Sequence, residues 1–171
     1  GRVQLLDSDF RLSDFIDGLV AEIICDSVGS LPLVSLTDHD VPEWIRADPI
    51  CLKKVLHSLV AHAVSDEPFS EMGVHISVSG QTAQQLGLSF LIQATGEARR
   101  CPPIGKSNEH RYRSIPIAQQ FARRLGGIID ELESSPEQRV WNFQVQVRPG
   151  RGQYQDNECA GLRGALAMLV D

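Results

Sequence analysis

Apolar residues follow two different spacings along this chain, one typical of helices and one typical of strands. Three segments place apolar side chains three or four positions apart, which is the period of an amphipathic helix. They are residues 12–28, 48–67 and 115–125. Six segments are short apolar runs or alternate apolar and polar positions, as strands do. They are residues 32–36, 44–46, 74–78, 86–92, 128–132 and 140–147.

The clearest boundary in this pattern is the start of the second helix. Asp48 is a favourable N-cap, and Pro49 fits the first helical turn. One face of this helix is wholly apolar and predicts a stripe that faces the core: Leu52, Val55, Leu56, Leu59, Val60 and Ala63. The neighbouring stripe is polar, because Ser58, His62 and Ser65 recur at positions i, i+4 and i+7.

The order of these elements predicts the fold class. Helix, strands, helix, hairpin, loop, helix and hairpin together indicate an α/β (α+β) two-layer sandwich, with about three helices packed on one face of a mixed, mostly antiparallel sheet. Residues 96–112 lack periodicity and collect Gly, Pro and charge, so we expect a long surface loop there. We expect one domain over residues 1–148, a polar linker over 149–161 and a new apolar segment over 162–171.

Composition excludes several classes of function. The chain has 171 residues, 42% of them hydrophobic, and a net charge of -6, which disfavours a surface that binds nucleic acid phosphates. Its four cysteines are widely spaced and lack a CxxC pair, so neither a zinc site nor a disulfide framework is expected. No apolar run approaches the roughly 20 residues that cross a bilayer. We therefore expect a cytoplasmic fragment without membrane contact, even if a membrane anchors its parent protein.

Residues 48–65, DPICLKKVLHSLVAHAVS, resemble a helix of the ATPase domains of sensor histidine kinases, which have a Bergerat-type fold. The family pattern is D-P-x-x-L-x-x-(I/V)-L-x-N-L-x-x-N-A-x-K. The resemblance continues in residues 94–96, in IPIAQQFARRLGGII and in ESSPEQRVWNFQVQV, and so covers roughly residues 1–148 in order. Residues 162–171 resemble the start of a receiver domain, which implies a hybrid kinase as the parent.

The resemblance assigns two positions of the second helix to the phosphate end of a nucleotide site. The family places two asparagines there, and the second supplies an oxygen to Mg²⁺. This chain has Ser58 and His62 at those positions. A hard Mg²⁺ ion prefers oxygen ligands, so an imidazole is a poor substitute.

Three further positions of that site fall at the end of a strand. The family aspartate that accepts a hydrogen bond from the adenine amino group corresponds to Ala94, which has no acceptor. Thr95 and Gly96 are retained, whereas the next family glycine corresponds to Ala98. The resemblance therefore implies a weakened selection of adenine.

The last two positions precede the third helix. Family glycines there let backbone N–H groups at the start of the helix approach phosphates. Tyr112 and Ser114 occupy those positions, and Pro116 removes one further donor. Together the altered positions imply a degenerate site, so we assign neither a catalytic residue nor a metal ligand.

The resemblance implies a role in two-component phosphorelay signalling as a pseudokinase domain with a regulatory or protein-interaction function. Its expected partners are the dimerisation helices and receiver domain of the same sensor protein, a partner kinase or a response regulator. No cofactor is assigned, and ATP with magnesium would bind only to a site that still functions. One alternative is an active kinase whose phosphoacceptor histidine lies outside the sequence, and another is a pocket that binds a different small-molecule or nucleotide signal.

Ordinary structural roles compete with each functional interpretation. A histidine at a helix edge such as His62 more often packs locally than acts as a ligand or a general base. Cations in the 96–112 loop, such as Arg99 and Arg100, could bind an anion or an acidic partner, but charge in a loop is usually only solvated. Cys101, which follows these arginines, is the one weak candidate for a reactive thiolate.

Overall fold

The computed structural model describes residues 5–26, 32–65, 70–96, 109–135 and 137–151. Side chains at 25–26, 64–65, 109–114 and 134 lie outside this description. The elements in chain order are β1 (Ser8–Arg11), α1 (Leu12–Asp26), β2 (Leu33–Thr37), β3 (Trp44–Ala47), α2 (Pro49–Ser65), β4 (Glu71–Gln81), β5 (Leu86–Thr95), α3 (Glu109–Arg124), β6 (Ile128–Ser134) and β7 (Gln138–Pro149).

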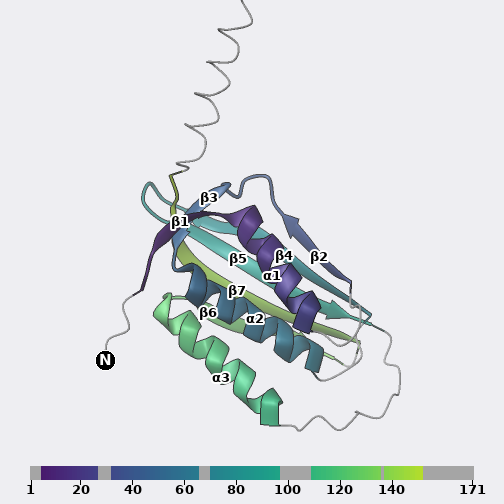
Figure 1. Ribbon diagram of the computed structural model, residues 1–171. Coiled ribbons are helices and arrows are strands. Elements are labelled where there is room, and N and C mark those ends of the chain that lie inside the picture. Colours follow the sequence, from purple (N-terminus) through teal and green to yellow (C-terminus); the bar gives the residue numbers. More distant parts are fainter. Residues whose placement is uncertain (1–4, 27–31, 66–69, 97–108, 136, 152–171) are drawn as a thin grey trace, which may run out of the picture.

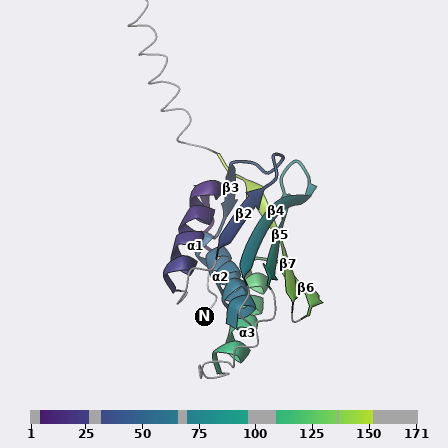
Figure 2. The same ribbon diagram turned by 90° about the vertical axis from the view of Figure 1, so that its right-hand side faces the viewer.

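The seven described strands form one sheet in the order β1-β3-β7-β5-β4-β2, and β6 also pairs with β7. Only β2 and β4 run parallel, and every other pair is antiparallel. All three helices cover one face of this sheet (Figures 1 and 2). The expected two-layer sandwich with a mixed, mostly antiparallel sheet is therefore confirmed.

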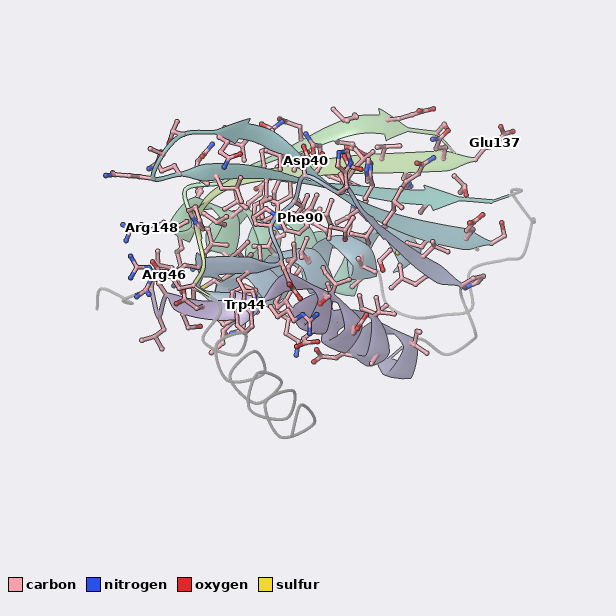
Figure 3. All side chains as sticks on the ribbon, turned by 90° about the horizontal axis from the view of Figure 1, so that it is seen from above. Asp40, Trp44, Arg46, Phe90, Glu137 and Arg148 are labelled. Atoms are coloured by element: carbon pink, nitrogen blue, oxygen red, sulfur yellow. The ribbon has the colours of Figure 1, made fainter. Side chains whose placement is uncertain are left out.

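The core lies between α2 and the central strands, where the side chains alternate in and out of the sheet. The six residues of the predicted apolar stripe on α2 are each at most 1% exposed. Opposite them, Phe90 of β5 and Phe143 of β7 are neighbours in register, with stacked rings 5.9 Å apart. Phe90 lies near the middle of the sheet in Figure 3. The periodicity of the sequence thus identified the buried face correctly.

Beyond shifts of a few residues at the ends of elements, two features differ from the sequence prediction. Strand β1 was not predicted, because its four residues carry no alternation and its structure comes from pairing with β3, where Phe10 lies beside Ile45. Helix α3 begins at Glu109, so the prediction that the loop extends to residue 112 is wrong. The six residues 109–114 have no apolar periodicity, and Pro116 lies inside the helix rather than at its start. Residues 97–108 lie outside the described part.

The domain boundaries remain predictions, because most of the segment beyond β7 lies outside the described residues. Strand β7 ends at Pro149, one residue beyond the expected end of the domain. The N–H of Gly150 then donates to the Trp44 carbonyl at 3.0 Å. The remainder of the expected linker, residues 152–161, and the expected receiver segment, 162–171, are not described.

Asp48 fixes the start of α2 as the sequence predicts. Its Oδ1 accepts hydrogen bonds from the N–H groups of Ile50 at 3.0 Å and Cys51 at 3.1 Å, which is the geometry of an N-cap. Its Oδ2 accepts a third bond, from the Leu6 N–H at 3.0 Å. Burial raises the pKa of Asp48, but the bonds from Cys51, Leu6 and Ile50 outweigh this effect and leave the pKa lowered.

We expect Asp48→Asn to lower the free energy of unfolding by about 1–2 kcal/mol at neutral pH, because a neutral amide replaces a buried charged acceptor. The lowered pKa means that the charge stabilises the fold above about pH 4 and that this contribution is lost as the pH falls through the folded-state value. The deficit of the variant should therefore shrink in acid. Urea unfolding at about pH 7 and pH 3 measures both effects, and a constant deficit would contradict the assignment. Asp130→Asn, an exposed substitution on β6, should cost under about 0.5 kcal/mol at neutral pH.

A glycine pair ends α3 in a Schellman motif. Gly126 has a φ of +71°, and its N–H donates to Arg123 O at 3.1 Å. The Gly127 N–H reaches back to Ala122 O at 2.8 Å. A Cβ added at Gly127 would lie 2.7 Å from both the Gln144 carbonyl oxygen and the Phe143 ring. The chain can therefore turn into β6 only with a residue that lacks a side chain.

Gly127→Ala should lower the free energy of unfolding by about 1–3 kcal/mol, because the added methyl group collides with backbone that cannot move cheaply. The matched control is Gly18→Ala on α1, where a Cβ meets nothing within 4 Å. That control should raise stability by about 0.5–1 kcal/mol, because alanine is the better helix former. Chemical denaturation of both variants measures the contrast, and equal effects would contradict the packing argument.

Candidate functional site

His62, on the polar edge of α2, packs against an aromatic side chain of β7. Ser58 and His62 are both half-buried. The His62 ring meets Trp141 of β7 edge to face, with centroids 5.5 Å apart and planes at 82°. This geometry is a favourable aromatic contact. His62 therefore packs against a neighbour, in keeping with the ordinary role weighed for it above.

The end of β5 lies beside this contact and carries the next three expected positions. Ala94 is 0% exposed and belongs to the hydrophobic core. The Thr95 carbonyl accepts hydrogen bonds from the Ser70 N–H at 2.9 Å and hydroxyl at 3.2 Å. The Gly96 N–H donates to Glu137 O at 3.1 Å. The turn is therefore fixed by backbone hydrogen bonds, and the position expected to carry an acceptor carries a buried methyl group.

Strand β7 brings two residues to the site that the sequence did not identify. Arg139 is the register neighbour of Ala94, and Trp141 is that of Ile92. Trp141 is 7% exposed, and its indole Nε1–H meets no hydrogen-bond acceptor among the residues that the structure describes. The only sequence signal was alternation, which puts positions 139 and 141 on the same face as the buried Phe143. The contact of Trp141 with His62 on α2 depends on strand register, which the sequence does not state.

The remaining expected positions cannot be placed as side chains. Ala98 lies outside the described residues. Tyr112 and Ser114 fall within the backbone of α3, but their side chains are not described. Over the described residues, no three His, Cys, Asp or Glu side chains gather as metal ligands would. The groups that can be placed are thus an imidazole, a hydroxyl, an indole, a guanidinium and a methyl group.

Cys51 on α2 is a free and buried thiol. Burial raises its pKa, and the neighbouring Asp48 carboxylate raises it further. A raised pKa keeps the thiol protonated, so Cys51 lacks the thiolate character of a reactive cysteine. Cys101, the weak candidate from the sequence, lies outside the described residues.

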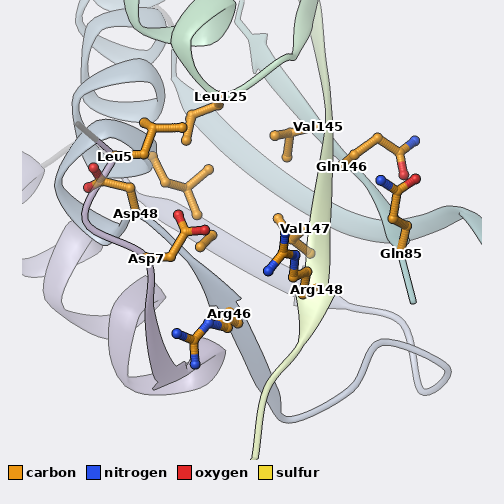
Figure 4. Close-up of a pocket in the computed structure, with 12 residues that line it drawn as sticks. Leu5, Asp7, Arg46, Asp48, Gln85, Leu125, Val145, Gln146, Val147 and Arg148 are labelled. Atoms are coloured by element: carbon orange, nitrogen blue, oxygen red, sulfur yellow. The ribbon is translucent and has the colours of Figure 1, made fainter. Parts of the chain in front are cut away.

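A cavity of about 240 Å³ lies at the opposite end of the domain from His62. Figure 4 shows the residues that line it. Its wall includes Leu52 from the first turn of α2, ten residues and so about 15 Å before His62 along the helix. Figure 3 shows the same separation along β7, with Arg148 at one end of the sheet and Glu137 at the other. The cavity is therefore a separate feature from the His62 site.

No helix of the described residues is long and apolar enough to span a membrane. No protein-family model and no curated protein matches the chain. Solved structures do match it, and the names of those described next point to histidine kinases.

The mycobacterial sensor histidine kinase MprB has 14% identity and a TM-score of 0.59, over 84% of this chain and 99% of that one. The catalytic domain of the histidine kinase ThkA has 16% identity and a TM-score of 0.55, over 86% and 99%. Full-length ShkA in complex with AMPPNP has 13% identity and a TM-score of 0.64, with 89% of this chain matching 33% of that one. The chain therefore has the fold of histidine kinase ATPase domains.

A double-mutant cycle tests the contact between α2 and β7. His62→Ala and Trp141→Leu should show a coupling of about 0.5–1.5 kcal/mol in the free energy of unfolding, the range for an aromatic pair. His57→Ala is the matched control, because position 57 lies on a different side of the same helix. Its cycle with Trp141→Leu should be additive within about 0.5 kcal/mol. Equal coupling in both cycles would contradict a specific contact.

Proposed function

We propose that this chain is the ATPase-like domain of a hybrid sensor histidine kinase and acts in two-component phosphorelay signalling as a pseudokinase. Its nucleotide site is too altered to hold Mg-ATP. Its role is then regulatory and depends on contacts with other domains of the same sensor, namely the dimerisation helices and the receiver domain, or with a partner kinase or response regulator. The fold supports the class of protein, and the altered site supports the role.

The observation that carries this proposal is the contact between His62 and Trp141. The resemblance places the oxygen ligand of Mg²⁺ at position 62, where an edge-to-face imidazole and indole pair is found instead. An imidazole is a poor ligand for Mg²⁺, and its ring is already packed against β7. A metal and a triphosphate at this position would have to displace an aromatic contact and would gain no oxygen ligand.

The neighbouring adenine position supports the same conclusion. Ala94 has neither an acceptor for an amino group nor any exposed surface. Its register neighbour is Arg139, whose guanidinium has only donors. Adenine presents an amino donor where the family aspartate accepts, and neither Ala94 nor the guanidinium of its register neighbour supplies a replacement acceptor. Selective binding of adenine is therefore disfavoured on chemical grounds as well as by packing.

Calorimetric titration of the 171-residue chain with Mg-ATP tests the proposal, and we expect no binding at micromolar concentrations. A thermal-shift panel of other nucleotides should likewise give no shift, because a ligand that binds only the folded state raises apparent stability. Micromolar Mg-ATP binding that His62→Ala abolishes and His57→Ala preserves would contradict the proposal and favour an active kinase. A saturable shift with a different nucleotide would instead favour a repurposed pocket.

A further inference from the structure

The cavity of about 240 Å³ is lined by the chain before β1, the first turn of α2, the residue after α3 and the end of β7. Its apolar wall has six residues drawn from five segments: Leu5, Ala47, Leu52, Leu125, Val145 and Val147. Burial of a small aliphatic group against this wall would be favourable, because it removes apolar area from water. The volume is below the roughly 300–1,000 Å³ typical of pockets for drug-sized ligands. A ligand of this cavity must therefore be small.

Charges of both signs line the same cavity. Asp7 comes from the segment before β1, and Arg148 comes from β7, so the two groups approach the cavity from different elements (Figure 4). Over the described residues, neither forms an ion pair with the other or with any third group. Opposite charges that share a cavity without meeting leave a place for a ligand that carries both.

The lining has two other charged groups, Arg46 and Asp48, and both are consistent with a ligand that carries both charges. Arg46 is the register neighbour of Arg148, so two guanidinium groups come from adjacent strands. Within the described part of the chain, the one ion pair of Arg46 is a long contact with Asp9, at 3.7 Å. The Asp48 carboxylate is already occupied by three backbone N–H groups. Asp7 is therefore the carboxylate of the described lining that remains available to a cation.

We propose that this cavity binds a free aliphatic α-amino acid of about the size of leucine or valine. The ammonium group pairs with Asp7, and the carboxylate pairs with Arg148 and Arg46, whose planar guanidinium groups suit a carboxylate. The aliphatic side chain packs against the apolar wall formed by Leu52, Val145 and their neighbours. This site goes beyond the proposed function and does not depend on it, because it lies at the other end of the domain from His62.

The test is calorimetry and thermal shift on the 171-residue chain with a panel built around leucine. Leucine and valine should bind saturably and raise the unfolding temperature. Isocaproate lacks the ammonium group, isoamylamine lacks the carboxylate and glycine lacks the side chain, so each should bind at least about tenfold more weakly than leucine.

Two variants locate the binding. Asp7→Asn and Arg148→Gln should each raise the dissociation constant of leucine at least about tenfold, because each leaves one ligand charge without a partner. Their matched controls are Asp130→Asn on β6 and Arg123→Gln in the last turn of α3, and both should preserve the affinity. Leu5→Ala should weaken the binding of leucine more than the binding of glycine, because it removes part of the apolar wall.

Several outcomes would overturn the proposal. They are the absence of saturable binding by any amino acid of the panel, binding of isocaproate as tight as that of leucine, and leucine binding that both cavity variants leave unchanged. The second outcome would identify an anion site, and the third would place leucine elsewhere on the chain. Mg-ATP binding does not enter this test, so its result and that of the nucleotide titration are independent.

Discussion

One buried carboxylate ties the start of α2 to the chain that leads into β1. Asp48 follows β3 directly and caps α2 through the N–H groups of Ile50 and Cys51, and it also accepts a bond from Leu6 in the chain that leads into β1. A helix that starts at a fixed residue presents a fixed face to the sheet, because each residue advances it by about 100°. The cap sets the residue at which α2 begins, and the apolar stripe then faces the core with Ser58 and His62 at its edge.

The residues that pack α2 on the sheet are different from those at its polar edge. The apolar positions that hold α2 on the sheet fit the pattern of the histidine kinase ATPase fold, and all of them are buried. At two positions where the resemblance predicts contact with a nucleotide, His62 packs against Trp141 and the buried Ala94 has Arg139 as its register neighbour. Burial of apolar area depends only on shape and hydrophobicity, whereas metal and base recognition depend on specific acceptors. A scaffold can therefore persist while its site changes.

The two ends of the sheet have different characters because different elements meet there. At the Glu137 end lie a turn held by backbone hydrogen bonds and the contact between His62 and Trp141. At the Arg148 end, the chain before β1, the start of α2 and the end of β7 leave a cavity with charges of both signs. Helix α2 runs from one end of the sheet to the other. Its position on the sheet therefore determines where its residues lie at both ends. Any ligand at the Arg148 end would also touch the segment that Asp48 ties to the helix.

The sequence by itself determined the class of fold, the start of α2, its buried face and both hairpins, because these features follow from local capping and from side-chain period. The family resemblance also predicts altered nucleotide contacts at positions 58, 62 and 94, and this stays a prediction. Only the tertiary structure decided that β1 is a strand, that Trp141 packs on His62 and that Asp7, Arg46 and Arg148 share a cavity. Those contacts join residues far apart in the chain, and they depend on strand pairing, which no local pattern encodes.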